Sequence, residues 1–190
     1  MKNRIRLATV WVLALALALP WLPGGRAAAA DGIVVTPAAA GSPLTQAEAE
    51  ALVNRMIGSG ITVSDVTWTG APAAFGTFSG GKDSIGFDSG IILSTGNAAD
   101  VVGPNDDVVS TSNDTDGDAD LSTLADKETY DAAVLEFDFV PARDKISFQY
   151  VFSSEEYNEY ANSDYNDTFA FFVNGENKAL IPNKNIPVSI

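Results

Sequence analysis

Aspartates alternate with small residues in the segment from Asp114 to Asp120, which has the sequence Asp-Thr-Asp-Gly-Asp-Ala-Asp. Alternating carboxylates around a glycine that permits a sharp bend are typical of loops that bring several hard oxygen ligands onto one Ca²⁺. If Gly117 takes the place of the EF-hand glycine, Thr123 falls where an EF-hand has its bidentate glutamate, so the segment is not an EF-hand. Two alternatives remain, a looser Ca²⁺ loop and a solvated acidic loop. The ligands of a Ca²⁺ loop would be Asp114, Asp116, Asp118 and Asp120.

A second group of carboxylates lies between two expected strands. Glu155 and Glu156 follow residues 146–152, and Asp167 directly precedes residues 168–173. Because strand ends and one loop can gather at one edge of a sheet, Glu155 or Glu156 can approach Asp167. The two glutamates point to opposite faces of an extended chain, so they cannot form a pair with each other. Three alternatives remain: a Ca²⁺ site, a solvated turn, and a glycosidase-like pair of Glu155 or Glu156 with Asp167 or Glu159.

One helix is expected before these strands, over residues 44–57. Thr45 and Glu48 have the spacing of a capping box, and Gly58 is typical of a helix end. The apolar side chains fall on one stripe of the helix, which must be buried against a larger element. These side chains are Ala49, Leu52, Val53, Met56 and Ile57.

Alternating apolar residues then predict β-strands. Residues 61–68 show the period of a strand, and the apolar run Gly90–Ser94 predicts a buried strand. The alternation in residues 134–140 predicts a strand whose apolar side chains are Leu135, Phe137 and Phe139. A turn at residues 141–144 and a second alternating strand at residues 146–152 would complete a β-hairpin.

The last strands complete the expected fold. Residues 168–173 are apolar on both faces and predict a central strand, and Asn174-Gly175 predicts a tight turn before an antiparallel return at residues 178–181. We therefore expect a mostly β protein: an antiparallel β-sandwich of jelly-roll type with one N-terminal helix packed against it. The sequence stops inside an expected strand, residues 186–190, so the domain is expected to continue.

The N-terminus has the three parts of a Sec signal peptide. Lys2, Arg4 and Arg6 precede the apolar run from Leu7 to Leu19, and alanines 27–30 provide a cleavage site. The run is shorter than the ~20 residues that span a bilayer, so cleavage is expected rather than a membrane anchor. This divides the chain into a signal peptide (residues 1–30), a flexible leader (31–43) and a β domain (44–190).

Cleavage at residue 30 would remove four basic residues and no acidic ones. The remaining 160 residues would hold seven basic against twenty-five acidic residues, a net charge of −18. Such a surface repels nucleic acid and anionic membranes and attracts cations such as Ca²⁺. The chain has no histidine and no cysteine, which excludes histidine-based triads, thiol catalysis and nearly all zinc sites. We therefore expect a protein that is not an enzyme.

Six sequence blocks follow one another along the chain: Gly90–Gly96, Gly103–Asn105, Gly117–Leu121, Tyr130–Phe139, Phe152–Tyr157 and Asn166–Phe172. In this order they resemble the choice-of-anchor L domain family, whose members are bacterial extracellular proteins with interchangeable C-terminal anchoring signals. The resemblance extends over residues 44–190 and implies display at the cell surface or secretion, without implying a ligand. No C-terminal sorting signal accompanies it.

Three functions follow as hypotheses. The first is a non-enzymatic extracellular module for adhesion or matrix assembly, with Ca²⁺-ordered acidic loops and a surface protein, matrix or glycan as its partner. The second is a carbohydrate-binding module that stacks sugar rings on aromatic side chains. The third is a glycoside hydrolase that uses the carboxylate pair described above. The candidate stacking residues are Trp68, Tyr157, Tyr160 and Tyr165.

Overall fold

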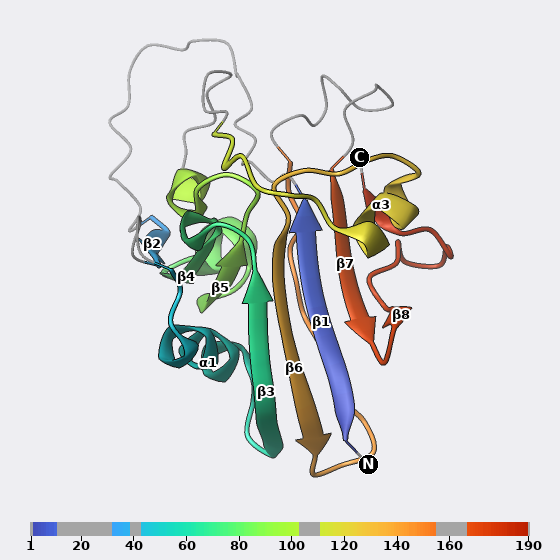
Figure 1. Ribbon diagram of the computed structural model, residues 1–190. Helices are drawn as coiled ribbons and strands as arrows, with labels where there is room; N and C mark the ends of the chain where they lie inside the picture. Colours follow the sequence, from blue (N-terminus) through green and yellow to red (C-terminus); the bar gives the residue numbers. More distant parts are fainter. Residues whose placement is uncertain (1, 11–31, 39–42, 103–110, 155–166, 190) are drawn as a thin grey trace.

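The larger of two antiparallel sheets forms the centre of the molecule (Figure 1). The computed structural model describes residues 2–10, 32–38, 43–102, 111–154 and 167–189. The order of the larger sheet is β3-β6-β1-β7-β8, and β9 also pairs with β7. Its strands are β1 (Asn3–Val10), β3 (Ile61–Thr69), β6 (Ala133–Pro141), β7 (Thr168–Val173), β8 (Glu176–Asn177) and β9 (Val188–Ser189).

The smaller sheet has the order β2-β4-β5, with β2 at Val34–Pro37, β4 at Phe75–Ser79 and β5 at Ser89–Leu93. Three α-helices accompany the sheets: α1 (Gln46–Met56), α2 (Lys82–Ile85) and α3 (Ala119–Ala125). Short 3₁₀ helices lie at Pro72–Ala74 and Ala98–Val102. Among the described residues, no helix has the length and apolar character needed to cross a membrane.

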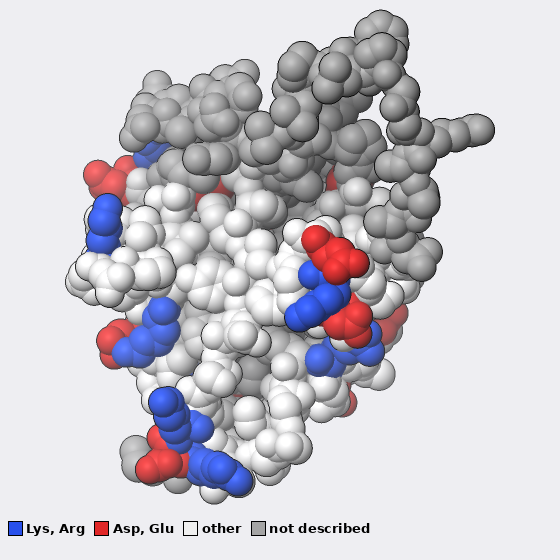
Figure 2. Space-filling view, turned by 180° about the vertical axis from the view of Figure 1, so that it is seen from behind, with Lys and Arg blue, Asp and Glu red and all other residues white. Residues whose placement is uncertain are grey.

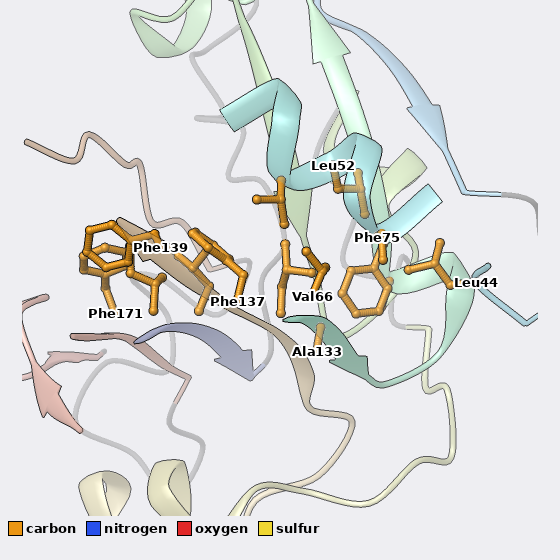
Figure 3. Packing of buried hydrophobic residues seen from close by; sticks show 14 of the residues in the cluster. Leu44, Leu52, Val66, Phe75, Ala133, Phe137, Phe139 and Phe171 are labelled. Atoms are coloured by element: carbon orange, nitrogen blue, oxygen red, sulfur yellow. The ribbon is translucent and has the colours of Figure 1, made fainter. Parts of the chain in front are cut away.

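The main apolar core lies on one side of the larger sheet, which we call the core face. Leu52 of α1 lies over Val66 of β3, and Phe137 and Phe139 of β6 lie beside Phe171 of β7 (Figure 3). Phe137 is only 1% exposed. Since complete burial of such a side chain contributes about 1.5–3 kcal/mol, these aromatic residues are major contributors to the stability of the fold.

The opposite side of the larger sheet, which we call the outer face, has a smaller core covered by α3. Leu121 of α3 packs against Ala8, Val134 and Phe172. The outer-face positions of β1 and β6 next to this core hold charged side chains. β1 contributes Arg4 and Arg6, and β6 contributes Glu136 and Asp138.

Helix α1 begins with the expected capping box. The backbone N–H of Glu48 donates to the Thr45 hydroxyl over 3.3 Å, and the backbone N–H of Thr45 donates to the Glu48 carboxylate over 2.8 Å. Hydrogen bonds from the side chain and backbone of Thr45 lower the pKa of the Glu48 carboxyl. The local sequence thus satisfies amide groups that have no partner inside the helix.

Replacing Thr45 with alanine is expected to lower the free energy of unfolding by about 1 kcal/mol, because a backbone N–H of α1 loses its acceptor. Thr45→Ser keeps the hydroxyl and serves as the control. A carboxyl group whose pKa is lowered in the folded state stabilises the fold at pH values above its unfolded-state pKa. This stabilisation is lost as the pH falls through the folded-state pKa. The difference between Thr45→Ala and the parent should therefore narrow in acid. Urea denaturation at neutral and acidic pH measures it, and a constant difference would contradict this pH dependence.

The structure confirms the mostly β, antiparallel sandwich and most of its expected strands. Residues 61–68 lie in β3, residues 134–140 in β6, and residues 168–173 form β7, which has neighbours on both sides. Asn174 and Gly175 both have positive φ (53° and 82°), as a tight type I′ turn requires. The return strand β8 pairs antiparallel with β7, but it lies at residues 176–177, directly after this turn, and not at the expected residues 178–181.

Residues 34–37, within the leader expected at residues 31–43, form β2 on the edge of β4. Two expectations about the elements were wrong. The apolar run in β5 is half-buried rather than buried, because β5 is an edge strand of the smaller sheet. Residues 146–152 are not assigned to a strand, because β1 occupies the position beside β6 that the hairpin would have used.

Candidate functional site

The most unusual feature of the sheet is the strand at its centre. β6 and β7 run in the same direction, and β1 lies between them, antiparallel to both. Ile5 lies opposite Phe137 of β6 and Val173 of β7, while Leu7 lies opposite Leu135 and Phe171. We call the position between β6 and β7 the slot. The residues that fill it are the basic region and the first apolar residues of the predicted signal peptide.

On the core face, β1 contributes buried apolar side chains to the main core. Ile5 is 7% exposed and Leu7 is 3% exposed. Both belong to the cluster that contains Phe137 and Phe171. Their burial explains why a segment with two arginines can be a central strand: the apolar and basic residues alternate, so each type faces one side of the sheet.

On the outer face, the guanidinium group of Arg6 contacts three carboxylates. It donates to Asp118 over 3.2 Å in one of two hydrogen bonds and to Asp120 over 2.8 Å, and it lies 3.6 Å from Glu136. Its charge also lies over the ring of Phe172, 5.9 Å from the ring centre. Burial disfavours the charged form, but the hydrogen bond and charge of Asp118 and the charges of Glu136 and Asp120 outweigh it and raise the pKa of Arg6.

The other two cations of β1 and its approach contact the same acidic surface from more exposed positions. Lys2 lies 3.0 Å from Asp138 and also donates to Asp65, and hydrogen bonds to these carboxylates raise the pKa of its ammonium group. Arg4 lies 3.4 Å from Glu136. In the described part of the chain, the positive partners of these outer-face carboxylates all come from residues 2–6.

The first acidic segment is organised by hydrogen bonds rather than by convergence of its aspartates. Asp118 caps α3 by accepting from the backbone N–H groups of Asp120 and Leu121, both at 3.1 Å. Asp116 forms an isolated β-bridge with Tyr130, and Asp114 accepts from Ser112. Each of the four aspartates therefore has a local structural role or a contact with β1.

Asp131 is a structural carboxylate that the sequence analysis missed. It is 3% exposed and accepts hydrogen bonds from the backbone N–H groups of Asn113 (3.2 Å) and Thr115 (2.7 Å) and from the Ser112 hydroxyl (2.9 Å). It therefore holds residues 112–115 against the start of β6. Its only sequence signal is its position in the block that begins at Tyr130.

The second acidic group cannot be assembled from the described residues. Asp167 is buried, at 1% exposed, and accepts a hydrogen bond from the Ser154 hydroxyl. Glu155, Glu156 and Glu159 lie outside the described residues, as do Tyr157, Tyr160 and Tyr165. Trp68, the fourth candidate for sugar stacking, packs at the border of the main core. In the described part of the chain, no three acidic side chains form a group that could hold a metal ion.

Residues 146–152 pass over the core face beside the slot. The ring of Phe148 stacks on Phe171, with ring centres 4.0 Å apart, and Tyr150 lies 4.9 Å from Phe169. A cavity of about 380 Å³ separates this segment from β5 and α2. These aromatic contacts hold residues 146–152 on the core face.

Figure 2 shows the molecule from behind, where most of the described surface is neutral and the charged side chains form small mixed groups.

Comparison with protein-family models matches residues 40–190 to the model described as Choice-of-anchor L domain. The match covers more than half of the chain and begins four residues before the expected boundary. No curated protein and no solved structure matches the chain.

Proposed function

Since the chain belongs to the choice-of-anchor L domain family over residues 40–190, it is a surface-associated extracellular module, and we propose that it is exported by a cleaved signal peptide and acts in adhesion or matrix assembly without catalysis. The family match is the observation that carries this proposal. The absence of histidine and cysteine from the sequence supports a binding role, because the commonest general bases and nucleophiles are missing. The partner is an extracellular protein, matrix or glycan.

Calcium is the second part of the proposal. In the uncleaved chain, Lys2, Arg4 and Arg6 neutralise Asp118, Asp120, Glu136 and Asp138 on the outer face. Cleavage after residue 30 would remove these three cations and leave a chain of net charge −18. Carboxylates without cationic partners favour a hard divalent ion. The acidic loop residues Asp114 and Asp116, together with Glu155, Glu156 and Asp167, remain candidate ligands.

Export is tested by expressing residues 1–190 in a bacterial host and measuring the mass of the product outside the cytoplasm. We expect a chain that begins at Asp31. Leu13→Arg with Leu15→Arg should keep the protein in the cytoplasm, because a charged apolar run does not enter the export pathway. The matched control places two arginines at the exposed positions Asn54 and Ser84 and should be exported normally. An exported product that retains residues 1–30 would contradict cleavage.

Calorimetric titration of the exported form with Ca²⁺ tests the second part. We expect Ca²⁺ binding and a higher melting temperature for this form. Binding should be weaker for the uncleaved chain, in which Lys2, Arg4 and Arg6 contact the carboxylates. Mg²⁺ at the same concentration is the control for general screening of charge. No heat and no gain in melting temperature at millimolar Ca²⁺ would overturn calcium binding and leave the export proposal intact.

A further inference from the structure

Two segments of this chain have the properties needed to fill the slot between β6 and β7. Because β6 and β7 run in the same direction, a strand that enters the slot antiparallel to one of them is antiparallel to both. β1 has this orientation. Residues 146–152 also run antiparallel to β7, since Phe148 contacts Phe171 and the later residue Tyr150 contacts the earlier residue Phe169.

The alternation of side chains agrees as well. A four-residue turn at residues 141–144 would pair Val140 with residue 145, and this register continues along β6. Phe148 would then lie opposite Phe137 and Tyr150 opposite Leu135. These are the positions that Ile5 and Leu7 occupy in the structure. Both segments therefore direct apolar side chains to the core face in the same register.

By entering the slot, the backbone N–H and C=O groups of residues 146–152 would gain hydrogen-bond partners in β6 and β7. In the described structure this segment pairs with no strand, although Phe148 and Tyr150 pack on the main core. Its aromatic and β-branched residues favour a pleated strand. Without β1, the facing edges of β6 and β7 would present unpaired N–H and C=O groups, which are costly when buried and prone to pair with other chains.

The balance between the two occupants is set by the outer face. There β1 provides Arg4 and Arg6, which contact Asp118, Asp120 and Glu136. Residues 147 and 149 would occupy the corresponding positions with neutral serine and glutamine side chains. The ion pairs therefore favour β1 while residues 1–30 are attached, and they are lost when these residues are removed.

We propose that residues 146–152 are the alternative central strand of this sheet and replace β1 when the N-terminal segment leaves the slot. The N-terminal segment then serves as a temporary strand, and its removal converts the sheet to a continuous meander of β6, residues 146–152 and β7. The event that removes β1, cleavage after residue 30, rests on the proposed function. The exchange itself requires only that β1 leaves, so it can be tested on purified protein without secretion.

Because the chain has no cysteine, pairs of engineered cysteines can report which strand fills the slot. Glu136→Cys with Arg6→Cys reports β1, and Glu136→Cys with Gln149→Cys reports the alternative strand. Directly opposed residues have Cα atoms about 4.5–5.5 Å apart, which suits a disulfide. Glu136→Cys with Val151→Cys lies on the same face, two residues out of register, and is the matched control.

The purified uncleaved chain carries an added protease site between Ala27 and Ala30, so that the residues before this site can be cut off and washed away. Before cleavage, the 6/136 pair should be the dominant cross-linked product. After cleavage, the 136/149 pair should become dominant, and the amides of residues 146–152 should gain at least about tenfold protection from hydrogen exchange. Added synthetic peptide of residues 1–27 should reverse the change.

Three outcomes would overturn the exchange. The first is a folded, cleaved chain in which the 136/149 pair cross-links no better than the control. The second is unchanged exchange of amides 146–152, and the third is a cleaved chain that fails to fold, since the alternative strand is proposed to complete the sheet. As a second route, Ile5→Asp with Leu7→Asp in the uncut chain should give the same shift in cross-linking. None of these outcomes depends on whether cells secrete the protein, so failure of export and failure of exchange are distinguishable.

Discussion

Replacing Gly117 with alanine is expected to lower the free energy of unfolding by about 3 kcal/mol or more, because the new methyl group overlaps backbone. A Cβ atom at this position would lie 1.8 Å from the carbonyl oxygen of Thr129 and 2.3 Å from its carbonyl carbon. The loop cannot move away easily. The backbone N–H of Asp118 donates to the Thr129 hydroxyl over 3.0 Å, and the backbone N–H of Ala132 donates to the carbonyl of Asp116 over 3.1 Å.

The control for this prediction is Gly58→Ala. Position 58 has ordinary backbone angles and no heavy atom within 4 Å of an added Cβ. Its free energy of unfolding should therefore stay within about 0.5 kcal/mol of the parent. Urea denaturation of both variants measures the difference. Equal midpoints for Gly117→Ala and Gly58→Ala would show that the contact between residues 117 and 129 is not a feature of the folded protein.

Substitutions in β1 of the uncleaved chain are expected to lower the free energy of unfolding only up to a limit, or ceiling, which is reached when residues 146–152 replace β1. Arg6→Glu puts a fourth carboxylate among Asp118, Asp120 and Glu136 and should expel β1. Once residues 146–152 have taken the slot, adding Ile5→Asp and Leu7→Asp should cost little more. Phe137→Ala in β6 should have no such ceiling and should cost about 3–5 kcal/mol, because both arrangements bury that ring.

Denaturation of the single, double and triple β1 variants measures this ceiling. Arg4→Glu is the matched control, because Arg4 is 54% exposed and contacts only Glu136 through its side chain among the described residues. Its effect should stay below about 1 kcal/mol. Additive losses along the β1 series, without a ceiling, would contradict competition between two strands for one slot.

Strand β6 was predictable from its strict alternation, although the same pattern in residues 146–152 did not give a strand. Leu135, Phe137 and Phe139 define β6 because a period of two has only one structural solution with a single buried face. Thr45 and Glu48 predict the start of α1 for a similarly local reason, since the capping box needs only four consecutive residues. In these elements, local preference and tertiary burial agree.

The occupant of the slot was not predictable from local pattern. Arg4, Ile5, Arg6 and Leu7 fit the basic start of a signal peptide, and they also fit a strand with one basic and one apolar face. Choosing between the two requires the positions of Asp118 and Glu136, more than a hundred residues later in the chain. The structural reasons for Gly117 and Asp131 were also not predictable from local pattern. The need for glycine comes from Thr129, and the role of Asp131 comes from residues 112–115.

The pairing of β1 with late strands also sets an order of events during synthesis. Val10 pairs with Thr168, so the N-terminal segment has no complete slot until β7 has left the ribosome. At 5–20 residues per second, this interval lasts roughly 8 to 30 s. If the chain is exported as proposed, targeting factors have that time to bind residues 1–30 in an extended form before the sheet can compete for them. The long separation along the chain between β1 and its partners would then favour translocation over premature folding.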